Sequence, residues 1–105
     1  MSKENKIPKT KEECFAVLDA MLSDEDKATI AAMEDTIELH FGLGMWIRNN
    51  WIYQQSEDDV KTLMRNFIDV DGNEDDFNYY FDVIQPDDYS AMILDAYQEY
   101  LKTFL

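Results

Sequence analysis

Hydrophobic residues recur at spacings of three and four along most of the chain, which is the pattern of helices that bury one face. The longest such run begins at Pro86 and continues to the C-terminus. Residues 12–22 and 57–68 carry similar stripes. A strand fits only residues 51–53, and no partner segment with alternating polarity accompanies it. The pattern therefore predicts an all-α fold, a single compact domain of about five helices over residues 10–105.

Three places along the chain combine a hydroxyl residue with acids in the next three positions, which is typical of a helix N-terminus. They are residues 10–13, 23–26 and 56–59. The hydroxyl can accept a hydrogen bond from a free backbone amide, and the acids lie at the positive end of the helix dipole. Pro86 followed by two aspartates gives a fourth start signal. We expect helices to begin at these four places.

The segment between residues 69 and 88 has the weakest pattern. It contains eight acids, no base and the turn-forming sequence Asp71-Gly72-Asn73. We expect an acidic turn followed by a short helix, with a two-stranded hairpin near residues 77–84 as the alternative. The oxygen-bearing side chains are of the type found in calcium loops, but the glycine falls at the wrong position for one. No calcium site is therefore expected.

Composition bounds the class of protein. Hydrophobic residues make up 46% of the chain and aromatic residues 13%, which is enough to offset the entropy lost on folding. Residues 1–9 are polar and precede the first helix signal, so we expect them to form a flexible arm. The single cysteine, Cys14, excludes an internal disulfide, and no signal segment or run of about 20 apolar residues is present. These features favour a cytoplasmic protein that does not associate with a membrane.

The formal net charge of the chain is −14. Four of the nine basic residues precede residue 12, so the helical body is more acidic than the chain as a whole. Such a surface repels the phosphates of nucleic acids and anionic lipid headgroups, and it attracts a basic protein. Charge of this kind also keeps a small protein soluble. We therefore expect no direct nucleic-acid binding and a basic protein as partner.

Residues 40–51 are the most distinctive segment, because they hold both tryptophans, the only histidine and two of the three glycines. We expect a helix to end near Gly42 and Gly44, where a glycine takes a left-handed conformation or lets another group approach closely. Two interpretations of the segment stay open. Either the tryptophans fill the core and Arg48 bonds a carboxylate or helix-end carbonyl groups, or the segment is an exposed recognition patch. The candidate ligand-binding residues are Trp46, Arg48, Asn49, Asn50 and Trp51.

Reactive chemistry has little support in the sequence. One histidine, His40, and one cysteine, Cys14, do not make up the ligand set of a catalytic zinc site. Neither residue has the sequence partners of a nucleophile relay, and the many carboxylates offer no preferred catalytic pair. We therefore expect no metal, no cofactor and no catalytic residue, and the chain is not predicted to be an enzyme.

Two segments carry a family resemblance. They are His-Phe-Gly-Leu-Gly-Met-Trp-Ile-Arg-Asn-Asn-Trp at residues 40–51 and Gln-Pro-Asp-Asp-Tyr-Ser at residues 85–90, followed by Ile93 and Leu94. Together they resemble a family of small bacterial proteins of unknown function, whose pattern joins an HFGLGxWIRNNW segment to a PDDxS helix start. The resemblance covers about residues 10–105 and implies no activity. The chain departs from the family after residue 51, where Ile-Tyr-Gln replaces a Gly-Leu-Trp-like continuation, and in the acidic residues 69–76.

The charge leads to a functional hypothesis. We predict an acidic protein-binding module, an inhibitor or immunity-type protein that covers a basic surface of a toxin, a nuclease or another protein that handles nucleic acids. Electrostatic steering followed by docking of aromatic anchors is the expected mechanism. The predicted partner-binding residues are Glu57, Asp58, Asp59, Asp69, Asp71, Glu74, Asp75, Asp76, Tyr79 and Tyr80.

Two alternatives belong to other classes of protein. One is a domain or enzyme that binds an anionic small molecule through Arg48, Asn49 and Asn50. The other is a homodimer that buries the final helix. A homodimer of this kind is favoured if the aromatic rings of Tyr89, Tyr97 and Tyr100 are exposed in the monomer.

Overall fold

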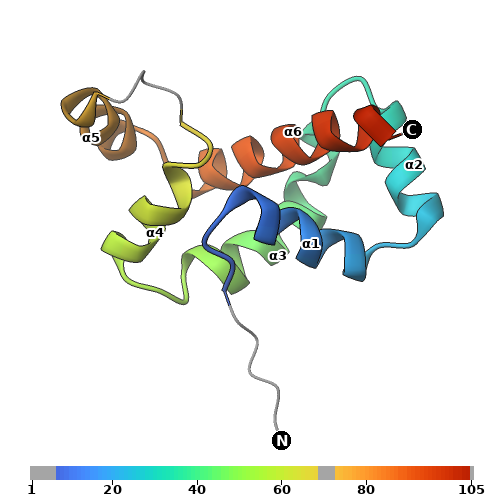
Figure 1. Ribbon diagram of the computed structural model, residues 1–105, viewed down its shortest axis with the longest axis horizontal. Coiled ribbons are helices and arrows are strands. Elements are labelled where there is room, and N and C mark those ends of the chain that lie inside the picture. Colours follow the sequence, from blue (N-terminus) through green and yellow to red (C-terminus); the bar gives the residue numbers. More distant parts are fainter. Residues whose placement is uncertain (1–6, 69–72, 105) are drawn as a thin grey trace, which may run out of the picture.

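The computed structural model describes residues 7–68 and 73–104, and every regular element in this part of the chain is helical (Figure 1). The all-α fold predicted from the sequence is confirmed. The elements are α1 Lys11–Met21, α2 Asp24–Ala32, η1 Ile37–Leu39, η2 His40–Gly44, α3 Met45–Ile47, η3 Arg48–Ile52, α4 Glu57–Met64, α5 Glu74–Val83 and α6 Pro86–Phe104. The alternative of a two-stranded hairpin near residues 77–84 is wrong, because residues 77–83 lie in α5 and Ile84 is its C-cap.

The predicted helix starts carry the expected capping bonds. The side-chain oxygen of Thr10 in front of α1, of Ser23 in front of α2 and of Ser56 in front of α4 accepts a hydrogen bond from the backbone N–H three residues later. Asn73 caps α5 in the same way, although its sequence was interpreted only as a turn. Acids occupy the first turn of each of these helices, where the helix dipole favours them. Much of the negative charge is therefore distributed among helix N-termini.

Helix α6 is the central element and runs across the molecule (Figure 1). Phe15 of α1 packs against Tyr97 of α6, with ring centroids 5.6 Å apart. Phe81 of α5 stacks on Tyr89 near the start of α6, with centroids 5.0 Å apart. Gln98 of α6 donates hydrogen bonds to backbone carbonyl groups at the end of α2. The apolar stripe predicted for the last helix is thus covered by other helices of the same chain.

The homodimer interpretation depended on exposed tyrosine rings on the final helix, and this packing contradicts that exposure. Tyr97 is fully buried, and Tyr89 is 6% exposed. Tyr100 is partly buried, and its hydroxyl group donates a hydrogen bond to Asp19 Oδ2 at 2.8 Å. A homodimer would therefore have to use a different surface.

Residues 7–9, which we expected to belong to a flexible arm, lie against the domain. Pro8 is buried, and Ile7 packs against the core. Asn66, just after α4, holds this segment by donating from Nδ2 to the carbonyl oxygen of Lys9 at 2.9 Å. The same side chain accepts a hydrogen bond from the Lys11 N–H at 3.3 Å. The rest of the predicted arm, residues 1–6, lies outside the described residues.

Residues 37–52 form one continuous helical stretch, so the helix end predicted at the glycines is wrong. Gly44 has φ −61° and ψ −44°, which are right-handed helical values. The two π-helical segments η2 and η3 flank the single α-helical turn of α3. The chain thus stays helical through a sequence that has the composition of a break.

Candidate functional site

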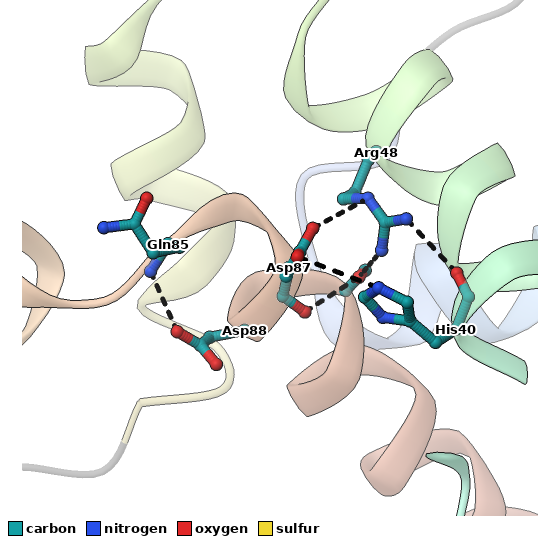
Figure 2. Close-up of polar contacts among 6 residues, drawn as sticks. His40, Arg48, Gln85, Asp87 and Asp88 are labelled. Carbon is teal, nitrogen blue, oxygen red and sulfur yellow. Dashed lines mark hydrogen bonds and ion pairs between the residues drawn. The ribbon is translucent and has the colours of Figure 1, made fainter. Parts of the chain in front are cut away.

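The guanidinium group of Arg48 lies inside the molecule, between the η2–η3 stretch and the first turn of α6 (Figure 2). The Arg48 side chain is only 7% exposed. Its Nη1 donates a hydrogen bond to Ser90 Oγ at 2.8 Å, and its Nη2 donates to the backbone carbonyl oxygen of His40 at 3.2 Å. Its Nε lies 3.3 Å from Asp87 Oδ1. Three internal acceptors therefore hold the guanidinium group.

Asp87 connects the same two parts of the chain a second time (Figure 2). Its Oδ2 lies 3.7 Å from His40 Nε2, and its backbone carbonyl oxygen accepts a hydrogen bond from Ser90 Oγ at 3.0 Å. Asp88 accepts a hydrogen bond from the Gln85 N–H at 2.9 Å and so caps the start of α6. We call Arg48, His40, Asp87 and Ser90 the Arg48 network.

Gly44 leaves room for the Arg48 side chain. A Cβ atom at this position would lie 3.2 Å from the carbonyl oxygen of Leu39 and 3.3 Å from Arg48 Nη1. Neither neighbour can move easily, because the first is helix backbone and the second is held by Ser90. Gly42 is different, since nothing lies within 4 Å of a Cβ atom built there. The sequence expectation of a close approach at a glycine therefore applies to Gly44 alone.

This contrast gives a prediction for a matched pair of substitutions. Gly42→Ala is expected to raise the free energy of unfolding by about 0.5–1 kcal/mol, because alanine restricts the unfolded chain and favours the helix. Gly44→Ala is expected to lower it by about 1 kcal/mol, because the new methyl group displaces the Arg48 side chain. Urea denaturation of the two variants measures the difference. Equal stability of the two proteins would contradict the close packing around Gly44.

The other candidate ligand-binding residues do not join Arg48 in one cluster. Trp51 is 3% exposed and belongs to the core, and Trp46 is partly buried with its ring 5.6 Å from the ring of Trp51. Asn50 donates from Nδ2 to the carbonyl oxygen of Trp46 at 2.8 Å, and Asn49 is exposed. The tryptophans therefore act in packing, while the two asparagines lie at the surface of the helix.

Two basic side chains, one in α4 and one directly after it, contact α5. Arg65, directly after α4, forms an ion pair with Glu74 in the first turn of α5, and its guanidinium group lies 4.3 Å from the ring centroid of Phe77. Lys61, one turn earlier in α4, lies 5.4 Å from the ring centroid of Phe81. Because Glu74 contacts the residue that follows α4, the acidic first turn of α5 lies at the C-terminal end of α4, away from the acidic first turn of α4 itself.

The predicted partner-binding residues consequently form two groups. Residues 57–59 lie in the first turn of α4, and residues 74–76 lie in the first turn of α5 together with the ion pair to Arg65. Tyr79 and Tyr80 lie on α5 and so belong with the second group. The remaining predicted residues, Asp69 and Asp71, lie outside the described residues.

The outward side of α5 combines exposed apolar and acidic side chains. Tyr79 is 69% exposed, Tyr80 is 48% exposed and Val83 is 53% exposed. Asp75 and Asp76 lie one helical turn before the two tyrosines, and within the described residues neither carboxylate forms an ion pair. We call these five residues the α5 face.

The sequence interpretation missed the partners of Arg48. The position of His40 near the predicted helix end indicates a capping or packing role, and Asp87 and Ser90 were noted only as parts of a helix start. Their signal was the resemblance itself, because the residues that resemble one family pattern in two distant segments are those that meet in the Arg48 network. The exposure of Phe41 does not follow from the sequence either, because its spacing of four from Ile37 is typical of a helical stripe that faces the core.

A family model described as a domain of unknown function (DUF6794) matches residues 7–101. The chain belongs to this DUF6794 family. The matched region includes every member of the Arg48 network and the whole of the α5 face. No curated protein and no solved structure matches the chain.

Within the described residues, no three side chains of His, Cys, Asp or Glu lie close enough together to hold a metal ion. None of the described helices has the length and apolar character needed to cross a membrane.

Proposed function

We propose that this chain is an acidic protein-binding module of the inhibitor or immunity type, which covers a basic surface of a protein partner. The observation that carries the proposal is the α5 face, where exposed tyrosines lie one turn from carboxylates that have no ion pair within the described residues. Tyrosine is among the residues that dominate the energy of protein interfaces. Carboxylates beside it select a cationic partner.

Ion pairs within the chain support the same proposal, because they occupy several of its basic side chains. Lys27, Arg48, Arg65 and Lys102 each lie within ion-pair distance of a carboxylate of the same chain. The acids greatly outnumber these bases, so the surface keeps a large negative charge. Such a field attracts a basic partner over a distance, and contacts made by Tyr79 and Tyr80 then hold the complex.

Capture experiments with matched variants test the proposal. Immobilised wild-type protein is expected to retain a basic protein from a lysate of the source organism at about 20 mM salt and to release it at about 500 mM salt. Tyr79→Ala/Tyr80→Ala is expected to weaken capture by about tenfold or more, since both rings are exposed and their loss leaves the core intact.

The control is Tyr53→Ala. Tyr53 is similarly exposed, at 59%. It lies directly after η3 and is not part of α5. Its replacement is expected to leave capture unchanged. Failure to retain any basic protein at low salt, or equal retention by the α5 double variant, would refute the proposal.

A further inference from the structure

A second surface carries exposed apolar side chains that the core does not need. Ile37 is 74% exposed, Phe41 is 79% exposed and Met45 is 42% exposed. Their spacing of four places them along one side of the η1–η2–α3 stretch, while Ile47 of α3 and Trp51 of the following η3 lie in the core. We call Ile37, Phe41 and Met45 the Phe41 stripe.

The backbone beside the stripe is accessible as well. Gly42 is exposed, and a Cβ atom built on it meets nothing within 4 Å. Phe41 contacts the ring of His40 edge-on, with centroids 4.8 Å apart, and His40 is itself tied to Asp87 of the Arg48 network. The network thus fixes the helix that presents the stripe, although the stripe itself contributes little to folding.

A cleft of about 360 Å³ adjoins the stripe between η1 and α6. Ile37 and His40 line it from one side, and Leu94 and Asp95 line it from the other. Asp95 Oδ1 accepts a hydrogen bond from Thr36 Oγ1 at 2.6 Å, which fixes its carboxylate at the wall of the cleft. The cleft is therefore partly apolar and bordered by negative charge.

The charge around this surface identifies the occupant. Asp35 and Asp95 line the cleft, and no lysine or arginine does so among the described residues. Glu34 and Glu38, which are close to Ile37 in the sequence, are exposed as well. A second copy of the chain would bring the same acids together, and nucleic-acid phosphates would be repelled. A cationic helix with one apolar face satisfies both the exposed apolar side chains and the carboxylates.

We propose that the Phe41 stripe and the adjoining cleft form a docking surface for a cationic amphipathic helix of a protein partner. Apolar residues of the helix cover Ile37, Phe41 and Met45, and a lysine or arginine side chain enters the cleft beside Asp95. This surface is separate from the α5 face, so the inference goes beyond the function proposed above and does not depend on it.

A titration of the isotope-labelled protein with a synthetic helix of leucine and lysine, followed by NMR, tests this proposal. Amide shifts are expected at residues 36–45 and 91–95, and Phe41→Ala is expected to weaken binding by about tenfold. Because Phe41 is exposed, the variant is expected to keep the melting temperature of the wild type. The same peptide with glutamate in place of lysine is expected not to bind.

Other outcomes would overturn the inference. Shifts confined to α5, unchanged affinity of Phe41→Ala, or a wild-type dimer in sedimentation that Phe41→Ala dissociates would each show that another occupant or surface is used. Tyr79→Ala is the control that separates the two proposals, because it should leave peptide binding at the Phe41 stripe unchanged. The capture experiment with the α5 double variant tests only the α5 face, so its result stands whatever the titration shows.

Discussion

Replacing Arg48 with alanine is expected to lower the free energy of unfolding by about 3 kcal/mol. The substitution leaves Ser90 Oγ, the His40 carbonyl oxygen and the Asp87 carboxylate without their donor. The Asp87 side chain is 61% exposed, so water can replace the guanidinium there and the loss stays at the lower end for a buried charge. Urea denaturation followed by circular dichroism measures the change.

Two further variants show whether the loss comes from the network. Asn49→Ala changes the exposed neighbour on the same helical turn and is expected to alter stability by less than about 0.5 kcal/mol. Arg48→Lys keeps the positive charge but loses the planar fork, so its stability is expected to lie between those of the wild type and Arg48→Ala. A wild-type unfolding midpoint for Arg48→Ala would contradict the structural role of the Arg48 network.

The second large effect is a loss of stability as the pH rises above about 9. Burial raises the pKa of the Cys14 thiol from 9.0 to about 12. Burial also raises the pKa of Tyr97 above its ordinary value of 10.0, and the hydrogen bond that its hydroxyl donates to Asp19 Oδ1 at 2.7 Å raises it further. At a pH between the unfolded and the folded pKa of each group, the folded chain therefore keeps a proton that the unfolded chain has released.

The sign follows from this difference in bound protons. A raised pKa in the folded state contributes stability that is complete below the unfolded value and is lost as the pH rises toward the folded value. The window for Cys14 runs from pH 9.0 to about 12. Within it, one thiol changes the free energy of unfolding by up to about 1.4 kcal/mol for each pH unit.

Urea unfolding measured at several pH values between about 8 and about 11 checks this expectation. Cys14→Ala and Tyr97→Phe each remove one titrating group, so both are expected to flatten the decline of stability with pH. As the pH is raised, Cys14→Ala should depart from the wild type at a lower pH than Tyr97→Phe does. The reason is that the ordinary pKa of a cysteine thiol, 9.0, is lower than that of a tyrosine hydroxyl, 10.0. Constant stability across this range, or a Cys14→Ala profile as steep as that of the wild type, would contradict the assignment.

Local signals predicted much of the fold. The hydroxyl caps at Thr10, Ser23 and Ser56 depend on atoms only three residues apart, so the sequence contains all the information that is needed. The apolar spacing of α6 predicted its buried face because that helix packs on one side along most of its length. The acidic start of α5 was harder, since Asn73 is as typical of a turn as of a helix cap.

The glycine segment was misjudged because its conformation depends on distant residues. Gly44 lies in helical backbone, and the Arg48 side chain passes close beside it to reach Ser90. Propensity alone favours a helix end at such a glycine, and tertiary packing overrides it. Phe41 shares one side of the stretch with Ile37, as the spacing of four indicates, but that side faces outward because Ile47 and Trp51 occupy the core.

The candidate site was predictable only in part. The excess of acids is plain from the sequence, but the separation of the acidic first turns of α4 and α5 depends on contacts of Arg65 with Glu74 and Phe77. The exposure of Tyr79 and Tyr80 depends on which side of α5 the neighbouring helices cover. These relations join residues that are distant in sequence, and periodicity does not record them.

The measurement that tests the acidic-module account most directly is the rate constant of association with the captured basic partner as a function of ionic strength. Electrostatic steering predicts that this rate constant falls by about tenfold or more between about 20 mM and about 500 mM salt. Tyr79→Ala/Tyr80→Ala is expected to raise mainly the dissociation rate. An association rate constant that does not change with salt would contradict the account.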